Sequence, residues 1–154
     1  MEDRRAGEAR KKALKKLLVR DRSEKELREI LRREGFQEAE TEDAVEYVKS
    51  FGYVNDRRYA ENYVMSAGRK KSRSALRSFL LEKGISEEDT EAALAELPVD
   101  EGELIRELLG KKAGEPRKMD EKELRRVFGY LARRGFSPGD IWRELKNFQD
   151  SAGL

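Results

Sequence analysis

The segment LREILRREGF, residues 27–36, decides the fold because its pattern returns twice, as LRSFLLEKGI at 76–85 and VFGYLARRGF at 127–136. In each copy, apolar residues lie eight and four positions before a glycine, and a large apolar residue follows the glycine. The four-residue spacing puts both side chains on one helical face, and a glycine followed by an apolar residue is a common helix C-terminus. The pattern therefore predicts three helices that each end in a glycine turn.

The residues after each glycine repeat too, with apolar side chains ten and thirteen positions later. These positions are Val45 and Val48, Leu94 and Leu97, and Leu145 and Phe148. Gly35, Gly84 and Gly135 are thus the turns of three similar helical hairpins, 49 and 51 residues apart. Because a pair of short helices is marginal alone, we expect a third helix in each unit. The segments 13–19, 57–67 and 103–110 supply it, with expected core residues Leu14, Leu17 and Leu18; Tyr59, Tyr63 and Val64; and Leu104, Ile105 and Leu108.

The predicted fold is all-α, a tandem array of three three-helix repeats with helix-turn-helix-like units, elongated and curved. We expect a basic N-terminal segment with the first repeat at 1–54, the second repeat at 55–98, and the third at 99–154 with a loop and hinge near 111–118. Ser23, Ser86 and the pair Ser137-Pro138 are the expected helix N-caps. No apolar and polar alternation is long enough to predict a strand.

Composition limits the chemistry. The 154 residues are 43% charged and 37% hydrophobic, and they include no cysteine and no histidine. The commonest general base, the usual zinc ligands and the thiol nucleophile are therefore missing, and we expect no enzyme activity, no cofactor and no metal. No apolar run reaches the length of a membrane span or resembles a secretory signal, so we expect a cytoplasmic protein that does not bind membranes.

Charges are segregated along the chain. Residues 1–20 hold eight basic and three acidic residues, for a net +5, and residues 69–83 hold six basic residues against one acid, again +5. Residues 86–107 hold nine acids against one arginine, for a net −8. A partner would therefore meet patches of opposite sign. The basic patches favour binding to DNA phosphates or to an acidic groove of a protein.

The candidate contacts with a partner or with DNA are basic residues near turns and on helix surfaces. They are Arg20, Arg22, Arg57, Arg58, Arg69, Lys70, Lys71, Arg73, Arg77, Arg125, Arg126, Arg133 and Arg134. Arg73 and Arg77 are four apart, so we expect them on one exposed helix face. For each of these basic residues, the alternative to a partner contact is that its charge is simply solvated at the protein surface. Tyr59 and Tyr63 are four apart, and core packing is the commoner role of aromatic residues at that spacing. Trp142 lies at the edge of the last helix's apolar stripe, where semi-buried packing is commoner than an interface contact.

Three motifs in this order resemble the RecX family of regulatory proteins. They are Arg20-x-Arg22-Ser23-x-x-Glu26-Leu27, then Gly52-Tyr53-Val54-Asn55-Asp56-x-x-Tyr59-Ala60, and then Leu80-x-x-Lys83-Gly84-Ile85. The resemblance covers residues 12–97 well, whereas the third unit matches mainly in hydrophobic spacing. Family members often carry Leu-Asp-Asp at 54–56 and Phe at 59, and the residues found here preserve volume or capping ability.

The resemblance implies a bacterial protein that binds the groove of the RecA filament on single-stranded DNA, in recombination, DNA repair and the SOS response. Family members generally restrain RecA, lowering ATP hydrolysis, strand exchange and filament growth, and some bind single- or double-stranded DNA directly. We expect a monomer in isolation. A non-specific helical DNA-binding module is the alternative, and the sequence leaves the direction of regulation open.

Overall fold

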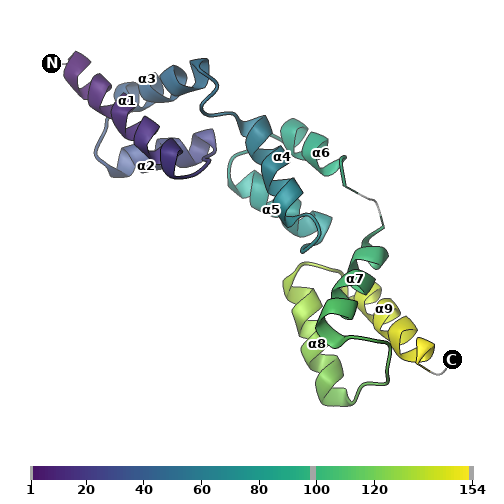
Figure 1. The fold of residues 1–154 in the computed structure, drawn as a ribbon. Helices are drawn as coiled ribbons and strands as arrows, with labels where there is room; N and C mark the ends of the chain where they lie inside the picture. Colours follow the sequence, from purple (N-terminus) through teal and green to yellow (C-terminus); the bar gives the residue numbers. More distant parts are fainter. Residues whose placement is uncertain (1, 98–99, 153–154) are drawn as a thin grey trace. The chain divides into compact units, whose positions relative to one another are not determined.

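A computed structural model describes residues 2–97 and 100–152. Within these residues the chain forms nine α-helices and no strand, joined by short turns (Figure 1). The helices are α1 Glu2–Val19, α2 Glu24–Arg33, α3 Glu38–Ser50, α4 Asp56–Ala67, α5 Arg73–Glu82, α6 Glu87–Leu94, α7 Glu101–Ala113, α8 Glu121–Arg133 and α9 Pro138–Ser151. The prediction of three tandem three-helix repeats is confirmed: α1–α3, α4–α6 and α7–α9.

The three glycine turns follow one geometry. Gly35, Gly84 and Gly135 have φ of +92°, +82° and +90°, a left-handed conformation that side chains with a Cβ rarely adopt. In each turn the amide after the glycine donates to a carbonyl five residues back, as from Phe36 to Leu31 at 3.1 Å. The glycine amide itself donates three residues back, which completes a Schellman motif. The local sequence is therefore sufficient to end α2, α5 and α8.

Side-chain caps fix the helix starts that the sequence predicts. The Ser23 hydroxyl accepts from the Glu26 amide, and the Glu26 carboxylate accepts from the Ser23 amide, so α2 begins with a full capping box. Ser86 caps the start of α6, and Ser137 caps α9 with Pro138 at its first position. The starts of α2, α6 and α9 are thus specified locally.

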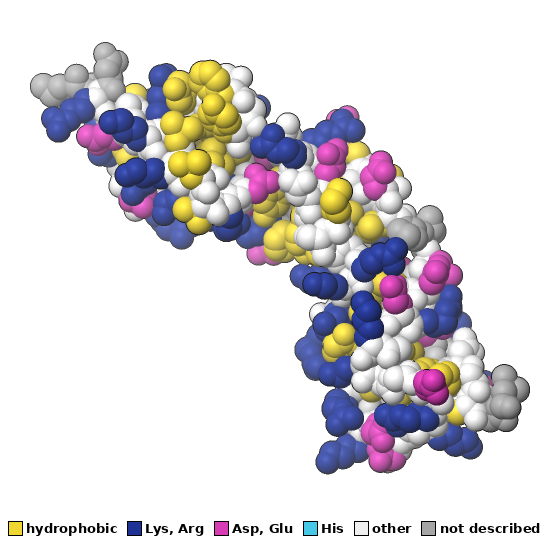
Figure 2. Space-filling view, in the orientation of Figure 1, with side chains coloured by type: hydrophobic (Ala, Val, Ile, Leu, Met, Phe, Trp, Pro, Cys, Tyr) yellow, Lys and Arg dark blue, Asp and Glu magenta, His cyan; other side chains and the backbone are white. Residues whose placement is uncertain are grey.

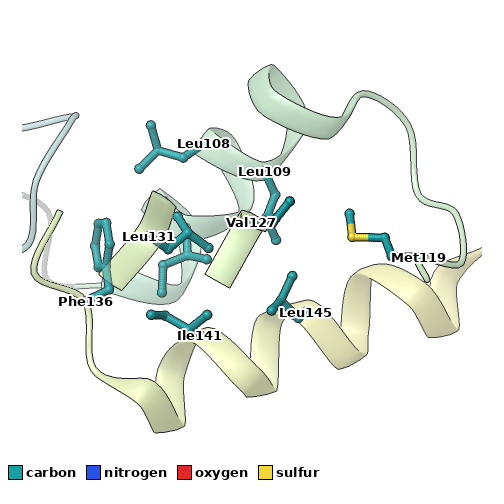
Figure 3. Packing of buried hydrophobic residues seen from close by; sticks show 9 residues of the cluster. Leu108, Leu109, Met119, Val127, Leu131, Phe136, Ile141 and Leu145 are labelled. Carbon is teal, nitrogen blue, oxygen red and sulfur yellow. The ribbon is translucent and has the colours of Figure 1, made fainter. Parts of the chain in front are cut away.

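Each repeat buries most of the residues that the spacing selects, while Leu97 and Phe148 are only partly buried. Leu27, Leu31, Val45 and Val48 are fully buried in the first repeat, and Leu76, Leu80 and Leu94 are buried in the second. In the third repeat, Val127 and Leu131 of α8 meet Ile141 and Leu145 of α9 and Leu108 and Leu109 of α7 (Figure 3). Met119, from the α7–α8 connection, closes one end of this core.

Two expected features differ in the structure. α1 begins at Glu2, and its buried face is Ala9 and Ala13, with Leu14 and Leu17 partly buried, whereas Leu18 is 86% exposed. The prediction of Leu18 as a core residue is wrong because Leu18 lies on the side of α1 opposite the buried Ala9, nine residues away along the helix. The expected 111–118 loop is shorter, since α7 continues to Ala113 and ends at Gly114, whose φ is +79°.

Contacts divide the chain into two compact units. One contains residues up to 63 together with 79–93, and the other contains residues 64–78 together with those from 94 onward. The second repeat contributes to both, so each unit includes one junction between consecutive repeats.

The two junctions use equivalent contacts. In the first unit, the Ser23 hydroxyl donates to the Lys83 carbonyl at 2.7 Å, and the Glu24 amide donates to Asp56 at 2.9 Å. In the second unit, the Ser72 amide donates to the Arg134 carbonyl at 2.9 Å, and the Arg73 amide donates to Glu101 at 2.6 Å. In both, the start of one repeat's second helix meets the glycine turn of the next repeat and a carboxylate from the next repeat's first helix. Consecutive repeats are therefore joined by one repeated motif.

Candidate functional site

The strongest candidate site is a basic face of α8, which we call the α8 surface: Lys122, Arg125, Arg126 and Arg133. Lys122, Arg126 and Arg133 share one helical face, because they are spaced by four and seven residues, and Arg125 adjoins it. All four are exposed, on the side opposite the buried Val127 and Leu131. Figure 2 shows Lys and Arg side chains gathered over α8.

The charges of the α8 surface are not neutralised by neighbouring acids. Among the described residues, none of the four side chains forms an ion pair with a carboxylate. Glu123, on the same helix, pairs instead with Arg117 of the preceding connection at 2.5 Å. Four guanidinium and ammonium groups are thus available to phosphates or carboxylates of a partner.

The predicted basic segment 69–71 adjoins the end of α8. The bond between the Ser72 amide and the Arg134 carbonyl brings together residues that are 62 positions apart in the sequence. Lys70 is exposed and Lys71 is partly exposed, whereas Arg69 forms an ion pair with Glu107 at 3.1 Å. Lys70 and Lys71 therefore extend the basic character of this end of the second unit.

Arg134 has an internal role. Its guanidinium lies 3.9 Å from the centre of the Tyr130 ring, and its Nε is buried without a hydrogen-bond partner. The side chain is only partly exposed, so stacking on Tyr130 holds it against the protein.

The prediction that Arg73 and Arg77 line one exposed face is wrong. Both are only partly exposed. The Arg73 guanidinium donates to the Leu94 carbonyl at 2.8 Å, and its other terminal nitrogen is buried. Because the Arg73 amide also binds Glu101, this residue belongs to the junction between repeats, and its guanidinium is engaged within the protein.

Arg20 and Arg22 line a second basic feature, a pocket of about 440 Å³ in the first unit. Its other basic lining residues are Lys16, Lys25, Arg33 and Lys83. At its wall the largely buried Glu26 binds Arg20 at 3.3 Å and Lys83 at 3.5 Å. Burial opposes ionisation of Glu26, but the Ser23 amide, Lys83 and Arg20 together hold its pKa below the ordinary value of 4.5. Arg20 is therefore partly neutralised, whereas Arg22 has no ion pair within the described residues.

Arg57 and Arg58 at the start of α4 differ in their surroundings. Arg57 is exposed and pairs with Glu61 at 3.5 Å on the same helix. Arg58 donates to the carbonyl oxygens of Gly52 and Tyr53, at 2.9 and 3.4 Å, and so closes the turn between α3 and α4. Arg57 is the one of the two whose side chain faces solvent.

Sequence reasoning missed two features near the α8 surface. Lys122 completes the basic face, and its spacing of four residues from Arg126 on a predicted helix was the available signal. The other is a stack between Phe128 of α8 and Trp142 of α9, with ring centres 4.7 Å apart. Trp142, which the spacing places at the edge of the core stripe, is 49% exposed.

The described part of the chain contains neither a cluster of metal-ligating side chains nor a membrane-spanning helix. Across residues 2–97 and 100–152 no three acidic side chains gather as a metal site would require. None of the helices in the same residues is long and apolar enough to cross a membrane.

Three family models match consecutive parts of the chain. The model for the RecX first three-helix domain matches residues 9–47, the second three-helix domain matches 55–94, and the third matches 100–145. The third repeat, whose resemblance rested on hydrophobic spacing, is thus matched by a model of its own.

Curated relatives and solved structures agree with these matches. The chain is 37% identical to the regulatory protein RecX of Amycolatopsis mediterranei over 134 residues, covering 84% of this chain and 77% of the relative. It is 33% identical to the regulatory protein RecX of Salmonella paratyphi B over 150 residues, covering 90% of each. The crystal structure of RecX from Lactobacillus salivarius shares the fold, with a TM-score of 0.71 at 22% identity over 97% of this chain and 99% of that one. The chain therefore belongs to the RecX family of regulatory proteins.

Proposed function

We propose that this protein acts by binding rather than catalysis, and that its target is the RecA filament on single-stranded DNA. Binding would restrain the filament, lowering its ATPase activity, strand exchange and growth. Membership of a family of regulatory proteins supports a regulatory role. The resemblance described above supplies RecA as the partner and the cytoplasm as the compartment.

The observation that carries the proposal is the α8 surface. Four exposed cations without carboxylate partners are a poor arrangement for stability, because they repel one another. They are a good arrangement for a polyanion, since binding would release the counterions that the phosphates hold. A filament that carries DNA offers phosphates, and its protein surface can add carboxylates.

The remaining basic residues are proposed as secondary contacts. Lys70 is exposed, and Arg22 and Lys71 are partly exposed. Arg20, Arg57 and Arg69 each pair with one acidic residue that a partner could replace. Arg58, Arg73 and Arg134 are held by internal contacts, so we expect their substitution to act mainly through folding. We retain repeat boundaries of 1–54, 55–98 and 99–154, and a monomer in isolation, as part of the proposal.

The experiment titrates RecA's single-stranded-DNA-dependent ATPase with the wild-type protein and with a variant carrying Arg125→Glu, Arg126→Glu and Arg133→Glu. We expect wild type to lower the rate and the variant to need at least tenfold more protein for the same effect. A control carrying Arg4→Glu, Lys11→Glu and Lys15→Glu changes net charge equally, at exposed positions of α1. An unchanged rate at saturating wild-type protein, or equal effects of the two variants, would count against the proposal.

A plain DNA-binding module is the second candidate, and the same unpaired cations favour it. For binding to single strands, the slope of log affinity against log salt is about −0.7 per phosphate contact. Loss of three arginine contacts should therefore reduce the slope by about 2. If wild type and variant differ in this slope on bare DNA but RecA's ATPase never responds, the second candidate is favoured.

A further inference from the structure

Trp142 presents an open aromatic face beside the α8 surface. Its ring stacks on Phe128 with centres 4.7 Å apart and planes inclined by 26°. Phe128 is partly buried and packs against the core of the third repeat. The tryptophan is thus supported on one side by a fixed ring, while half of its surface stays in solvent. Its rotamer is constrained before any ligand arrives, which lowers the entropic cost of binding there.

Basic side chains flank this aromatic pair. Arg125 lies three residues before Phe128 on α8, so both occupy one side of that helix. Lys146 lies four residues after Trp142 on α9 and is exposed. Arg143 is also exposed but is engaged by Asp140 at 2.9 Å and Glu144 at 3.6 Å. The open ring therefore has unpaired positive charge from Arg125 and Lys146 on its two helices.

We propose that Trp142 is a stacking platform for an unpaired base of single-stranded DNA, whose phosphates are held by the α8 surface. The inference rests on the proposed function, because it names what the same surface touches within the filament. Aromatic faces combined with cations along a backbone path are the common means of binding single strands without sequence preference.

Two features favour a nucleic acid over an apolar protein segment as the occupant. Among the described residues of the third repeat, Trp142 is the only large hydrophobic side chain that is exposed, whereas an amphipathic helix needs several anchors along a groove. Arg125 and Lys146 have no carboxylate partner among the described residues, so their charges complement phosphates.

The test uses two substitutions of similar size. Trp142→Phe keeps an aromatic face, whereas Trp142→Leu keeps an apolar side chain on Phe128 and removes the π-face. Circular dichroism and thermal unfolding verify that both variants fold. In anisotropy titrations of labelled oligo(dT) without RecA, we expect Trp142→Leu to lose roughly tenfold in affinity and Trp142→Phe to stay within about threefold of wild type, given the usual worth of one stacked base.

A direct signal comes from the protein itself, because Trp142 is its only tryptophan. Oligo(dT) should quench its fluorescence, and an abasic strand of equal length and charge should bind more weakly and quench little. Equal affinity of the Leu and Phe variants for oligo(dT), or equal quenching by the abasic strand, would overturn the proposal. Quenching by oligo(dT) combined with no effect on RecA would leave the base platform standing and reject filament regulation.

Discussion

Alanine at Gly84 should destabilise the protein more than alanine at Gly35, although the two glycines have the same local conformation. Their φ values are +82° and +92°, and both close a Schellman motif. They differ in surroundings: a Cβ at Gly35 would meet nothing within 4 Å, whereas a Cβ at Gly84 would lie 2.6 Å from the Lys25 Cβ. The contact at Gly84 is with the start of α2 in the preceding repeat, so the comparison isolates the junction.

The expected losses of unfolding free energy follow from the cost of the left-handed backbone conformation and from the cost of the clash at Lys25. A left-handed conformation costs an L-residue about 1–2 kcal/mol, which both variants share. The Lys25 Cβ is fixed to the backbone of α2, so relief of the clash requires movement of the helix start and weakens the bonds from Ser23 to Lys83 and from Glu24 to Asp56. Such overpacking costs about 1–3 kcal/mol more. We therefore expect Gly84→Ala to exceed Gly35→Ala by about 1–3 kcal/mol in lost unfolding free energy.

Urea denaturation followed by circular dichroism at 222 nm measures the difference, provided that the variants share the wild-type slope. Amide hydrogen exchange reports on the junction itself. The Glu24 amide should exchange faster in Gly84→Ala and should stay protected in Gly35→Ala. Equal destabilisation by the two substitutions, with Glu24 equally protected, would refute the junction as the source of the cost.

Two further predictions concern buried carboxylates. Because the pKa of Glu26 is lower in the folded state than its ordinary 4.5, its ionised form stabilises the fold above that pH and this contribution is lost as the pH falls through the folded-state pKa. Glu26→Gln should lower the free energy of unfolding by about 1–3 kcal/mol at pH 7 and should make that free energy less dependent on pH in the acid range. The substitution Glu29→Gln, at an exposed position, should have neither effect. Glu144 is 3% exposed and binds Arg106 at 3.1 Å, so Arg106→Ala should destabilise the third repeat by about 1–3 kcal/mol. Arg117→Ala, which breaks the more exposed pair with Glu123, should cost at most about 1 kcal/mol when both are followed by Trp142 fluorescence in urea.

The fold could be predicted from the sequence because its signals are local. The glycine turns at Gly35, Gly84 and Gly135 and the caps at Ser23 and Ser137 each depend on residues within a few positions of one another. The extent of α1 could not be predicted, because it depends on how closely Ala9 and Ala13 approach α3. That approach is a property of packing between segments that are distant in the sequence.

The candidate site was only partly predictable for the same reason. A basic residue is available to a partner only if no distant group has already engaged it, as Glu107 engages Arg69 and the Leu94 carbonyl engages Arg73. Residue spacing identifies the faces of one helix but does not identify such partners. Arg125, Arg126 and Arg133 were predicted and are exposed. The hairpin pattern around Gly135 predicts that α8 and α9 pack together, but it does not predict that Trp142 stacks on Phe128, because both lie outside the predicted core stripes.

The most direct test of the central claim is equilibrium binding to immobilised single-stranded DNA, either bare or coated with RecA and a slowly hydrolysed ATP analogue. The account predicts tighter binding to the coated strand. It also predicts at least tenfold weaker binding when Arg125, Arg126 and Arg133 are replaced by glutamate, and little change for the matched triple replacement on α1. Wild-type affinity that is no higher for the coated strand than for the bare one would contradict filament binding, and a triple α8 variant that binds as tightly as wild type would contradict the assigned surface.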